Sequence, residues 1–380
     1  MAEPIAPGTW VELHTIVLSP RERAPQVPED TNVELCRAHG LTVTGVTKGT
    51  AGHPEVAQAM IRGGVTSIGE SQLDNIERLT QAGVRMPYLL LRLPSLAEVD
   101  DVARMVDISL NSEFAVLAGL SRAALRHQRV HQVIVMVDLG DLREGLWPHE
   151  VVPFINQAVS LPGIRIVGLG TNLACFGGVV PNAEHMTRLV AIATDVERAC
   201  GLALEWISGV NSSGLNLLAA GSMPTRINHA RIGEAILLGR ETTHRQPWPG
   251  TAQDAFVLHA DILELKWKPS VPIGERGENA FGQLPPVANH GLMARALVNI
   301  GREEVPVEGL MPCDQRLTIL GASSSYLVVD MTAAADCYHV GDELTFTLTY
   351  GALLSVMTSA YVQKRPLWND PPLIATPTET

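Results

Sequence analysis

From about residue 41 to residue 240, short runs of β-branched and aliphatic residues alternate with segments that carry apolar residues at helical spacing. Val56, Ala59, Met60 and Gly63 show the i, i+3, i+4 spacing of such a helix. Each run is followed by a helix or a helix-like connection, which predicts an α/β fold of the (β/α)₈ TIM-barrel type. A doubly wound sheet is the rival, but no GxGxxG follows the first run. The expected strands span residues 41–48, 65–69, 87–92, 106–110, 132–138, 164–170, 204–208 and 225–231.

After about residue 250 the pattern changes to β-type runs separated by Gly and Pro, such as AFVLHADILELKWK and ELTFTLTYG. These runs predict a C-terminal, mostly antiparallel β domain. Residues 9–17 form a further strand that lies outside the barrel and could pair with this domain. Residues 19–31, which are rich in proline and charge, predict an exposed loop. We therefore expect a barrel over residues 18–245 and a β domain over residues 1–17 and 246–380.

Composition narrows the class of protein. The chain has 380 residues, of which 46% are hydrophobic and 18% charged, as expected for a well-buried enzyme. It has no apolar run of 18 residues and no signal peptide at its start, so we expect a cytoplasmic protein without a membrane partner. The formal net charge of −12, with no basic block, argues against a nucleic-acid partner.

The five cysteines are scattered, odd in number and never spaced as CxxC. This pattern argues against structural zinc and against a disulfide framework. We expect buried free thiols and no metal site.

The ends of the predicted strands carry the candidate chemistry, because barrel active sites lie at the C-terminal ends of the strands. Lys48 ends the first strand and is the only lysine in the first 265 residues. A lysine that is desolvated at such a position is a competent imine former. An ordinary surface lysine is the alternative.

The remaining strand ends are polar too, and together they predict a ring of polar groups around Lys48. The SGVNSSG and RIGE segments offer backbone N–H groups at helix starts, where a barrel commonly binds phosphate after its last two strands. For the Ser and Asn residues a role as turn formers is the alternative. The strand-end residues of interest are Arg143, Asn172, Asn211, Ser212, Ser213, Arg231 and Gly233.

Four motifs, GVTKGTAGHPEVAQAMIRGG, GLGTNLACFGG, RIGEAILLGRETTHR and GASSSYLVVD, resemble the ornithine racemase branch of the alanine racemase family. The resemblance extends from about Trp10 to Val362. It implies an N-terminal barrel, a C-terminal β domain, and a homodimer whose active sites are shared between subunits. The implied cofactor is pyridoxal 5′-phosphate, and the implied substrate is a small amino acid.

The resemblance also implies roles for individual residues. Lys48 matches the lysine that holds the cofactor as a Schiff base. Arg231 matches the arginine at the pyridine nitrogen, and Arg143 matches the one near the ring hydroxyl. Asn172 stands where alanine racemases have a histidine close to the cofactor. The phosphate-binding positions correspond to Ser212 or Ser213, Gly233 and Glu234.

Three departures from the family concern the catalytic centre. Phe281, in GENAFGQLPP, replaces the tyrosine that serves as the second base, and Met136 replaces a lysine. Ser325 and Tyr326 stand where the ornithine racemase branch often has Asp-His. Racemisation needs an acid and a base on opposite faces of Cα, with Lys48 on one of them. Tyr326 is our candidate for the other.

For Tyr326, a packing or hydrogen-bonding role is the alternative. Cys313 and His339 are weaker candidates for the second base.

Three hypotheses therefore remain. The first is a pyridoxal-phosphate-dependent amino-acid racemase. The second is other chemistry on the same scaffold, of the aldolase or dehydratase type, whose metal could be held only by Cys313, Cys337 and His339 brought together by the fold. The third is a non-catalytic cofactor carrier, which the predicted C-terminal β domain disfavours.

Overall fold

The computed structural model describes residues 8–14 and 32–367, which form two compact units. The barrel unit holds the described residues 32–253, and the sheet unit holds residues 8–14 and 254–367. The predicted loop at 19–31 lies outside the described residues. The domain limits at residues 18 and 245 stay a prediction.

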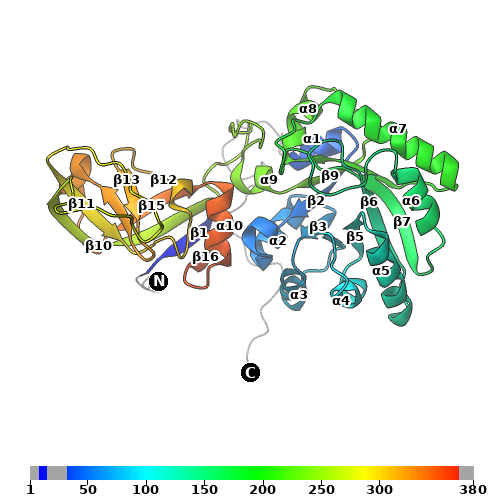
Figure 1. Ribbon diagram of the computed structural model, residues 1–380, viewed down its shortest axis with the longest axis horizontal. Coiled ribbons are helices and arrows are strands. Elements are labelled where there is room, and N and C mark those ends of the chain that lie inside the picture. The colour runs from blue at the N-terminus through cyan, green and yellow to red at the C-terminus, as the bar shows by residue number, and fades with distance from the viewer. Residues whose placement is uncertain (1–7, 15–31, 368–380) are drawn as a thin grey trace. The chain divides into compact units, whose positions relative to one another are not determined.

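The barrel unit contains the closed parallel barrel that the sequence predicts, with all eight strands in the expected order (Figure 1). The barrel closes where the first strand pairs with the last, with Thr42 beside His229 and Thr44 beside Arg231. The strands are β2 (Thr42–Val46), β3 (Ser67–Glu70), β4 (Tyr88–Leu90), β5 (Ile108–Asn111), β6 (His131–Met136), β7 (Ile164–Gly170), β8 (Trp206–Asn211) and β9 (His229–Ile232).

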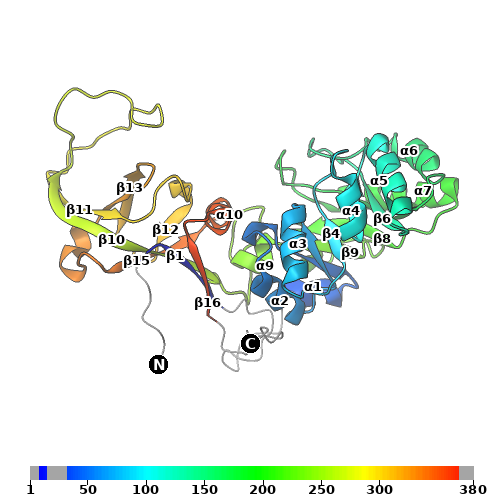
Figure 2. The same ribbon diagram turned by 90° about the horizontal axis from the view of Figure 1, so that it is seen from below.

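Each barrel strand is followed by a helix, and the helices lie outside the ring of strands (Figures 1 and 2). In α2 the residues Val56, Ala57, Ala59 and Met60 are buried, as the helical spacing of apolar residues predicts. The helices are α1 (Asn32–Ala38), α2 (Pro54–Arg62), α3 (Leu73–Gln81), α4 (Val99–Met105), α5 (Phe114–Arg126), α6 (Val151–Ala158), α7 (Ala183–Cys200), α8 (Leu215–Ala219) and α9 (Glu234–Leu238).

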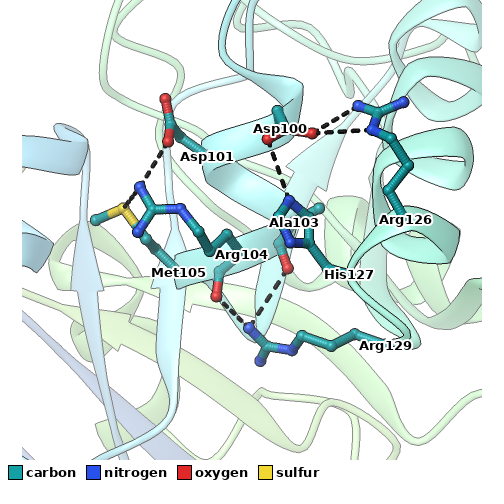
Figure 3. Close-up of polar contacts among 8 residues, drawn as sticks. All are labelled: Asp100, Asp101, Ala103, Arg104, Met105, Arg126, His127 and Arg129. Atoms are coloured by element: carbon teal, nitrogen blue, oxygen red, sulfur yellow. Dashed lines mark hydrogen bonds and ion pairs between the residues drawn. The ribbon is translucent and has the colours of Figure 1, made fainter.

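Charged side chains join two of these helices on the outside of the barrel (Figure 3). Asp100 of α4 accepts hydrogen bonds from Arg126 at the end of α5, at 2.6 Å, and from His127, at 3.1 Å. Arg129 donates to the backbone carbonyls of Ala103 and Arg104. These contacts hold α4 against α5, although exposed ion pairs of this kind add little to stability.

The interior of the barrel is apolar on one side and polar on the other. The apolar side is a cluster of buried residues from β4 to β7. Met136, which stands where the resemblance places a lysine, belongs to this cluster and is fully buried. The polar side comes from β8, β9, β2 and β3, where Ser208, His229, Thr44 and Ser67 are all buried.

The sheet unit is an eight-stranded sheet in which every pair of strands is antiparallel except β1 and β16. The long strand β10 pairs with β1 and β15 along its first half and with β11 beyond an irregularity at Ile262–Glu264 (Figure 2). The strands are β1 (Trp10–His14), β10 (Phe256–Pro269), β11 (Leu292–Val298), β12 (Leu310–Pro312), β13 (Thr318–Ala322), β14 (Leu327–Asp330), β15 (Glu343–Leu348) and β16 (Gln363–Leu367).

The described residues of the same unit include one α-helix, α10 (Tyr350–Thr358). The described part of the chain has no helix long and apolar enough to cross a membrane. It also has no group of three or more His, Cys, Asp or Glu side chains that could hold a metal ion.

All five cysteines are free, as expected, but the expectation that they are buried is wrong for most of them. Only Cys36, on the inner face of α1, is buried, whereas Cys175, Cys313 and Cys337 are exposed because they lie in surface connections.

The two buried histidines of the barrel predict how stability depends on pH. Burial, together with Arg231, lowers the pKa of His229 to about 3, and burial, together with Arg129, lowers that of His131 to about 4. At pH values between the unfolded pKa near 6.5 and these lowered pKa values, the two histidines bind protons in the unfolded chain but not in the folded chain. The free energy of unfolding should therefore fall as the pH is lowered from about 6.5 to about 5.

Each histidine contributes up to about 1.4 kcal/mol per pH unit in this range. Urea denaturation of the native protein and of a His131→Asn variant, at several pH values between 7 and 5, measures this slope. The variant should lose the contribution of one histidine. Equal slopes in the two proteins would show that His131 binds the same number of protons in the folded and the unfolded state.

Candidate active site

Lys48 follows β2 after one residue, Thr47, and begins a short 3₁₀ turn (Lys48–Thr50) at the C-terminal end of the barrel strands. The turn continues through Ala51 and Gly52, both with positive φ, at 50° and 61°. A Cβ atom at position 52 would lie 2.7 Å from the Cβ of Asn75. Glycine therefore allows the backbone to pass close to the start of α3.

A buried carboxylate supports this turn from the next strand. Glu70, the last residue of β3, accepts hydrogen bonds from the Thr47 hydroxyl at 2.7 Å and from the Asn75 side-chain amide at 3.0 Å. Arg78 donates to Asn75 and to the backbone carbonyl of Ala51. Burial raises the pKa of Glu70, and its hydrogen bonds act in the opposite direction. Thr47, which precedes Lys48, is thereby anchored to β3.

Arg231 lies inside the barrel on β9, almost fully buried. Its Nη1 donates to the carbonyl and to the hydroxyl of Ser208, and its Nη2 donates to the carbonyl of Thr171 at 2.6 Å. Burial lowers the pKa of Arg231 to about 10, so the guanidinium stays charged at neutral pH. Since β9 pairs with β2, Arg231 and Lys48 belong to neighbouring strands at the same end of the barrel.

The connections that follow β7 and β8 are joined by side chains that the sequence places in the site. Asn211 donates to the Asn172 side chain at 3.1 Å and to the carbonyl of Leu173 at 2.9 Å. The side-chain oxygen of Asn211 accepts from both the N–H and the hydroxyl of Ser213. The Asn172 Nδ2 and the Thr171 hydroxyl are buried and have no partner in the described residues.

Ser212 connects the starts of two short helices. Its hydroxyl oxygen accepts from the backbone N–H of Gly233 at 3.4 Å and of Ala235 at 3.2 Å. The turns after β8 and β9 therefore meet at the Ser212 hydroxyl, which accepts from two backbone N–H groups that follow β9. A Cβ atom at position 233 would come within 3.1 Å of Val46, so Gly233 allows β9 to run close to the end of β2.

Two further predicted residues of the barrel unit, Arg143 and Glu234, form ion pairs with residues close to them in the chain. The guanidinium of Arg143 contacts both carboxylate oxygens of Glu144, and this contact raises the pKa of Arg143. Glu234, the first residue of α9, pairs with Arg245. The side chain of Glu234 thus holds the loop that follows α9, and its backbone lies at the helix start.

In the sheet unit, Tyr326 ends the turn between β13 and β14 and is 46% exposed. The backbone N–H of Arg302 donates to Ser323 in the same turn, and the Arg302 guanidinium lies 5.1 Å from the centre of the Phe281 ring. Gly301 packs so closely that a Cβ atom there would lie 2.0 Å from the Ser324 carbonyl. Arg302 thus contacts both the Phe281 ring, through its guanidinium, and the turn that contains Tyr326, through its backbone N–H.

Sequence reasoning missed several residues of this site. Thr47, Asn75 and His229 contact Glu70 or the surroundings of Arg231, but none of them ends a predicted strand. For His229 a signal was present, because it precedes Arg231 by two residues and so faces the same side of β9.

Comparison with known families matches residues 30–241 to the profile described as alanine racemase, N-terminal domain. The chain is 40% identical over 334 residues to the ornithine racemase of Acetoanaerobium sticklandii, covering 88% of this chain and 94% of that one. It is 37% identical over 332 residues to the lysine racemase of Thermotoga maritima, covering 87% and 93%.

Among solved structures, the alanine racemase from a D-cycloserine-producing Streptomyces lavendulae superposes with a TM-score of 0.73. The superposition covers 96% of this chain and 98% of that one at 16% identity, and supports the fold alone.

The start of the chain has a second likeness. Residues 4–51 match the profile described as AKP thiolase subunit OrtA. A stretch of 24 residues is 75% identical to the 2-amino-4-ketopentanoate thiolase alpha subunit of Acetoanaerobium sticklandii, which is 6% of this chain and 24% of that one.

The turn that carries Lys48 predicts that Gly52 is hard to replace. Gly201 has nearly the same φ, 64°, but its surroundings are open, so it is a matched control. Gly201→Ala should lower the free energy of unfolding by about 1 kcal/mol because of its backbone conformation alone. Gly52→Ala adds the clash with Asn75 and should cost about 2 kcal/mol more, as overpacking does. Urea denaturation measures both, and equal losses would contradict the close packing of this turn.

Proposed function

The chain belongs to the alanine racemase family, and we propose that it is an amino-acid racemase that uses pyridoxal 5′-phosphate and acts on ornithine. One observation carries the proposal. Lys48 and Arg231 stand at the same end of a closed barrel, in a chain that is 40% identical to an ornithine racemase.

The residues at this end of the barrel fit a phosphorylated pyridine ring. Asn172 and Thr171 offer buried polar atoms that no described residue uses. Within the described residues the Nε of Arg231 has no hydrogen-bond partner, so that N–H can face a ligand. The backbone N–H groups of Gly233 and Ala235, which donate to the Ser212 hydroxyl, lie at the start of α9, and barrels commonly bind phosphate at such helix starts.

In this proposal Lys48 would hold the cofactor through its aldehyde carbon, and Arg231 would donate to the ring nitrogen. Arg143 would lie near the ring hydroxyl. Pyridoxal phosphate, when bound, draws electrons away from the α carbon of an attached amino acid, which makes the α proton removable. The turns after β8 and β9 would hold the phosphate, with Asn211, Ser212, Ser213, Gly233 and Glu234.

The chain's own task is to move a proton on both faces of the α carbon. The Lys48 amine is the base on one face. The barrel unit has one tyrosine, Tyr88, which begins β4 at the opposite end of the barrel and donates to the carbonyl of Val84. A tyrosine that serves as the second proton donor must therefore come from elsewhere, and we assign this role to Tyr326 of a second copy of the chain. The active enzyme is then a homodimer with shared sites.

The reaction type follows from the relatives. The ornithine racemase and the lysine racemase are racemases by name, which favours racemisation over aldolase or dehydratase chemistry on this scaffold. A cytoplasmic location stays a prediction.

Ornithine is favoured over lysine by two independent likenesses. The match to the ornithine racemase has the higher identity. The start of the chain resembles a subunit of an enzyme named for 2-amino-4-ketopentanoate, which has five carbons, as ornithine has, whereas lysine has six. One methylene in a pocket is worth about 10- to 200-fold in kcat/KM.

The first prediction is that the protein loaded with pyridoxal phosphate racemises ornithine, with a kcat/KM at least about 10-fold higher than for lysine. Borohydride reduction should attach the cofactor to the peptide that contains Lys48. Lys48→Ala should abolish the labelling and lower racemisation by about 10³-fold or more, whereas Lys266→Ala should change neither.

Chiral chromatography and peptide mass analysis give these readouts. Labelling of another lysine would overturn the role of Lys48. A protein that exchanges the α proton without inversion would overturn racemisation.

The second prediction uses two inactive variants. Tyr326→Phe should bind the cofactor and exchange the α proton of one enantiomer, but lose racemisation, whereas Tyr361→Phe, on an exposed position, should stay active. When Tyr326→Phe and Lys48→Ala subunits assemble at random in equal amounts, half of the dimers hold one intact site. Activity should recover to about a quarter of the native value. No recovery would exclude sites shared in this way, and a fully active Tyr326→Phe would exclude Tyr326 as the second proton donor.

A further inference from the structure

Arg231 is a buried cation whose hydrogen bonds within the described residues all go to neutral groups, while the Glu144 carboxylate acts on it only through its charge. Among the described residues no carboxylate forms an ion pair with it, and its acceptors are the Thr171 carbonyl and the carbonyl and hydroxyl of Ser208. Buried charges are usually paired, because an isolated one is costly. The neutral groups around Arg231 must therefore present their acceptor sides to it.

One of these acceptors, the Ser208 hydroxyl, is the first member of a chain of hydrogen bonds inside the barrel. The Ser208 hydroxyl lies 2.6 Å from Nδ1 of His229, and Nε2 of the same ring lies 2.8 Å from the Thr44 hydroxyl. The Thr44 hydroxyl lies 2.6 Å from that of Ser67. All these side chains are buried, and the chain links four adjacent strands, β8, β9, β2 and β3.

The guanidinium fixes the direction of this chain. Arginine only donates, so the Ser208 oxygen accepts from it. The Ser208 proton then has the His229 Nδ1 as its acceptor. A neutral imidazole whose Nδ1 accepts carries its proton on Nε2 and donates it to Thr44, which in turn donates to Ser67. In this arrangement each of the four side chains has an acceptor or donor role that fits its neighbour.

Two further observations support a neutral, immobile imidazole. Burial, and next the charge of Arg231, lower the pKa of His229 to about 3. The Trp206 ring stacks on it at 4.3 Å between centroids and an angle of 25°. A flip of the ring would replace both nitrogen contacts by carbon, so the hydrogen bonds also fix its orientation.

We propose that Ser208, His229 and Thr44 are positioning residues, which hold the Arg231 guanidinium in place through a hydrogen-bond chain of fixed direction. The inference rests on the proposed function, because Arg231 is taken there to contact the cofactor. Ser208 touches Arg231, and His229 and Thr44 act through Ser208.

The direction of the chain is tested in the full-length protein with bound cofactor. ¹⁵N NMR of protein labelled at histidine distinguishes the two neutral tautomers, because protonated and unprotonated ring nitrogens have well separated shifts. The His229 signal, identified with His229→Asn, should show a proton on Nε2. Thr44→Val removes the acceptor and keeps the side-chain shape, so the Nδ1–H form should increase. A native His229 protonated on Nδ1 would overturn the proposed direction.

The effect on Arg231 needs a matched control, which the same barrel provides. Ser109 and His131, on β5 and β6, form another buried pair, with 2.7 Å between the hydroxyl and Nε2, and Arg231 is not part of it. Ser208→Ala and Ser109→Ala each remove a serine hydroxyl from a buried histidine. Only Ser208→Ala also removes a partner of the cation, and a hydrogen bond to a charged group is worth about 10- to 100-fold in affinity.

Ser208→Ala should therefore weaken pyridoxal phosphate binding by at least about 10-fold and lower kcat, with the KM for ornithine unchanged. Ser109→Ala should keep cofactor affinity within about 3-fold, at a similar loss of stability. Equal losses of affinity in the two variants would overturn the inference and leave the racemase proposal intact. An inactive native protein that binds the cofactor and shows the predicted difference would refute the racemase and keep the positioning role.

Discussion

The pairing of β2 with β9 brings together residues that are more than 180 positions apart, and the site depends on it. Thr42 lies beside His229, and Thr44 lies beside Arg231. Because the strands are parallel, Lys48 leaves the barrel at the same end at which Arg231 approaches the mouth. The ladder that closes the barrel also sets the Thr44 hydroxyl against the His229 ring. Closure and site geometry are therefore one constraint, since a shift of register would turn these side chains to the other face.

The barrel interior shows how this constraint is supported. From β4 to β7 it is filled by apolar side chains, including Met136, which need only to pack. From β8 through β9 and β2 to β3 it contains hydrogen-bonding side chains, which also need partners, because a buried polar group without one costs about 1–3 kcal/mol. The polar side is thus less tolerant of substitution than the apolar side. It is also the side that contacts Arg231.

The local sequence pattern was enough to predict the eight barrel strands and the positions of Lys48 and Arg231 near the C-terminal ends of two of them, because the end of a strand can be recognised from the change in hydrophobic pattern. It was not enough for β12 (Leu310–Pro312), which is very short, or for β16 (Gln363–Leu367), which is rich in polar residues and pairs with β1. His229 was missed for a related reason, because its partners lie on other strands and no local signal records a contact between Thr44 and His229 across 185 positions. Asn75 was missed although its partner Glu70 is only five residues away, because it lies on α3 and not at a strand end.

The cations on the outside of the barrel have a chemical consequence. The ion pairs of Figure 3 use arginine, as in Arg104–Asp101 and Arg126–Asp100, and no residue before Lys266 other than Lys48 is a lysine. A guanidinium stays protonated and does not condense with aldehydes as a lysine amine does. The barrel unit therefore offers an aldehyde a single side-chain amine, that of Lys48. Selectivity for one attachment point comes from the amino-acid composition of the unit, before any binding pocket contributes to it.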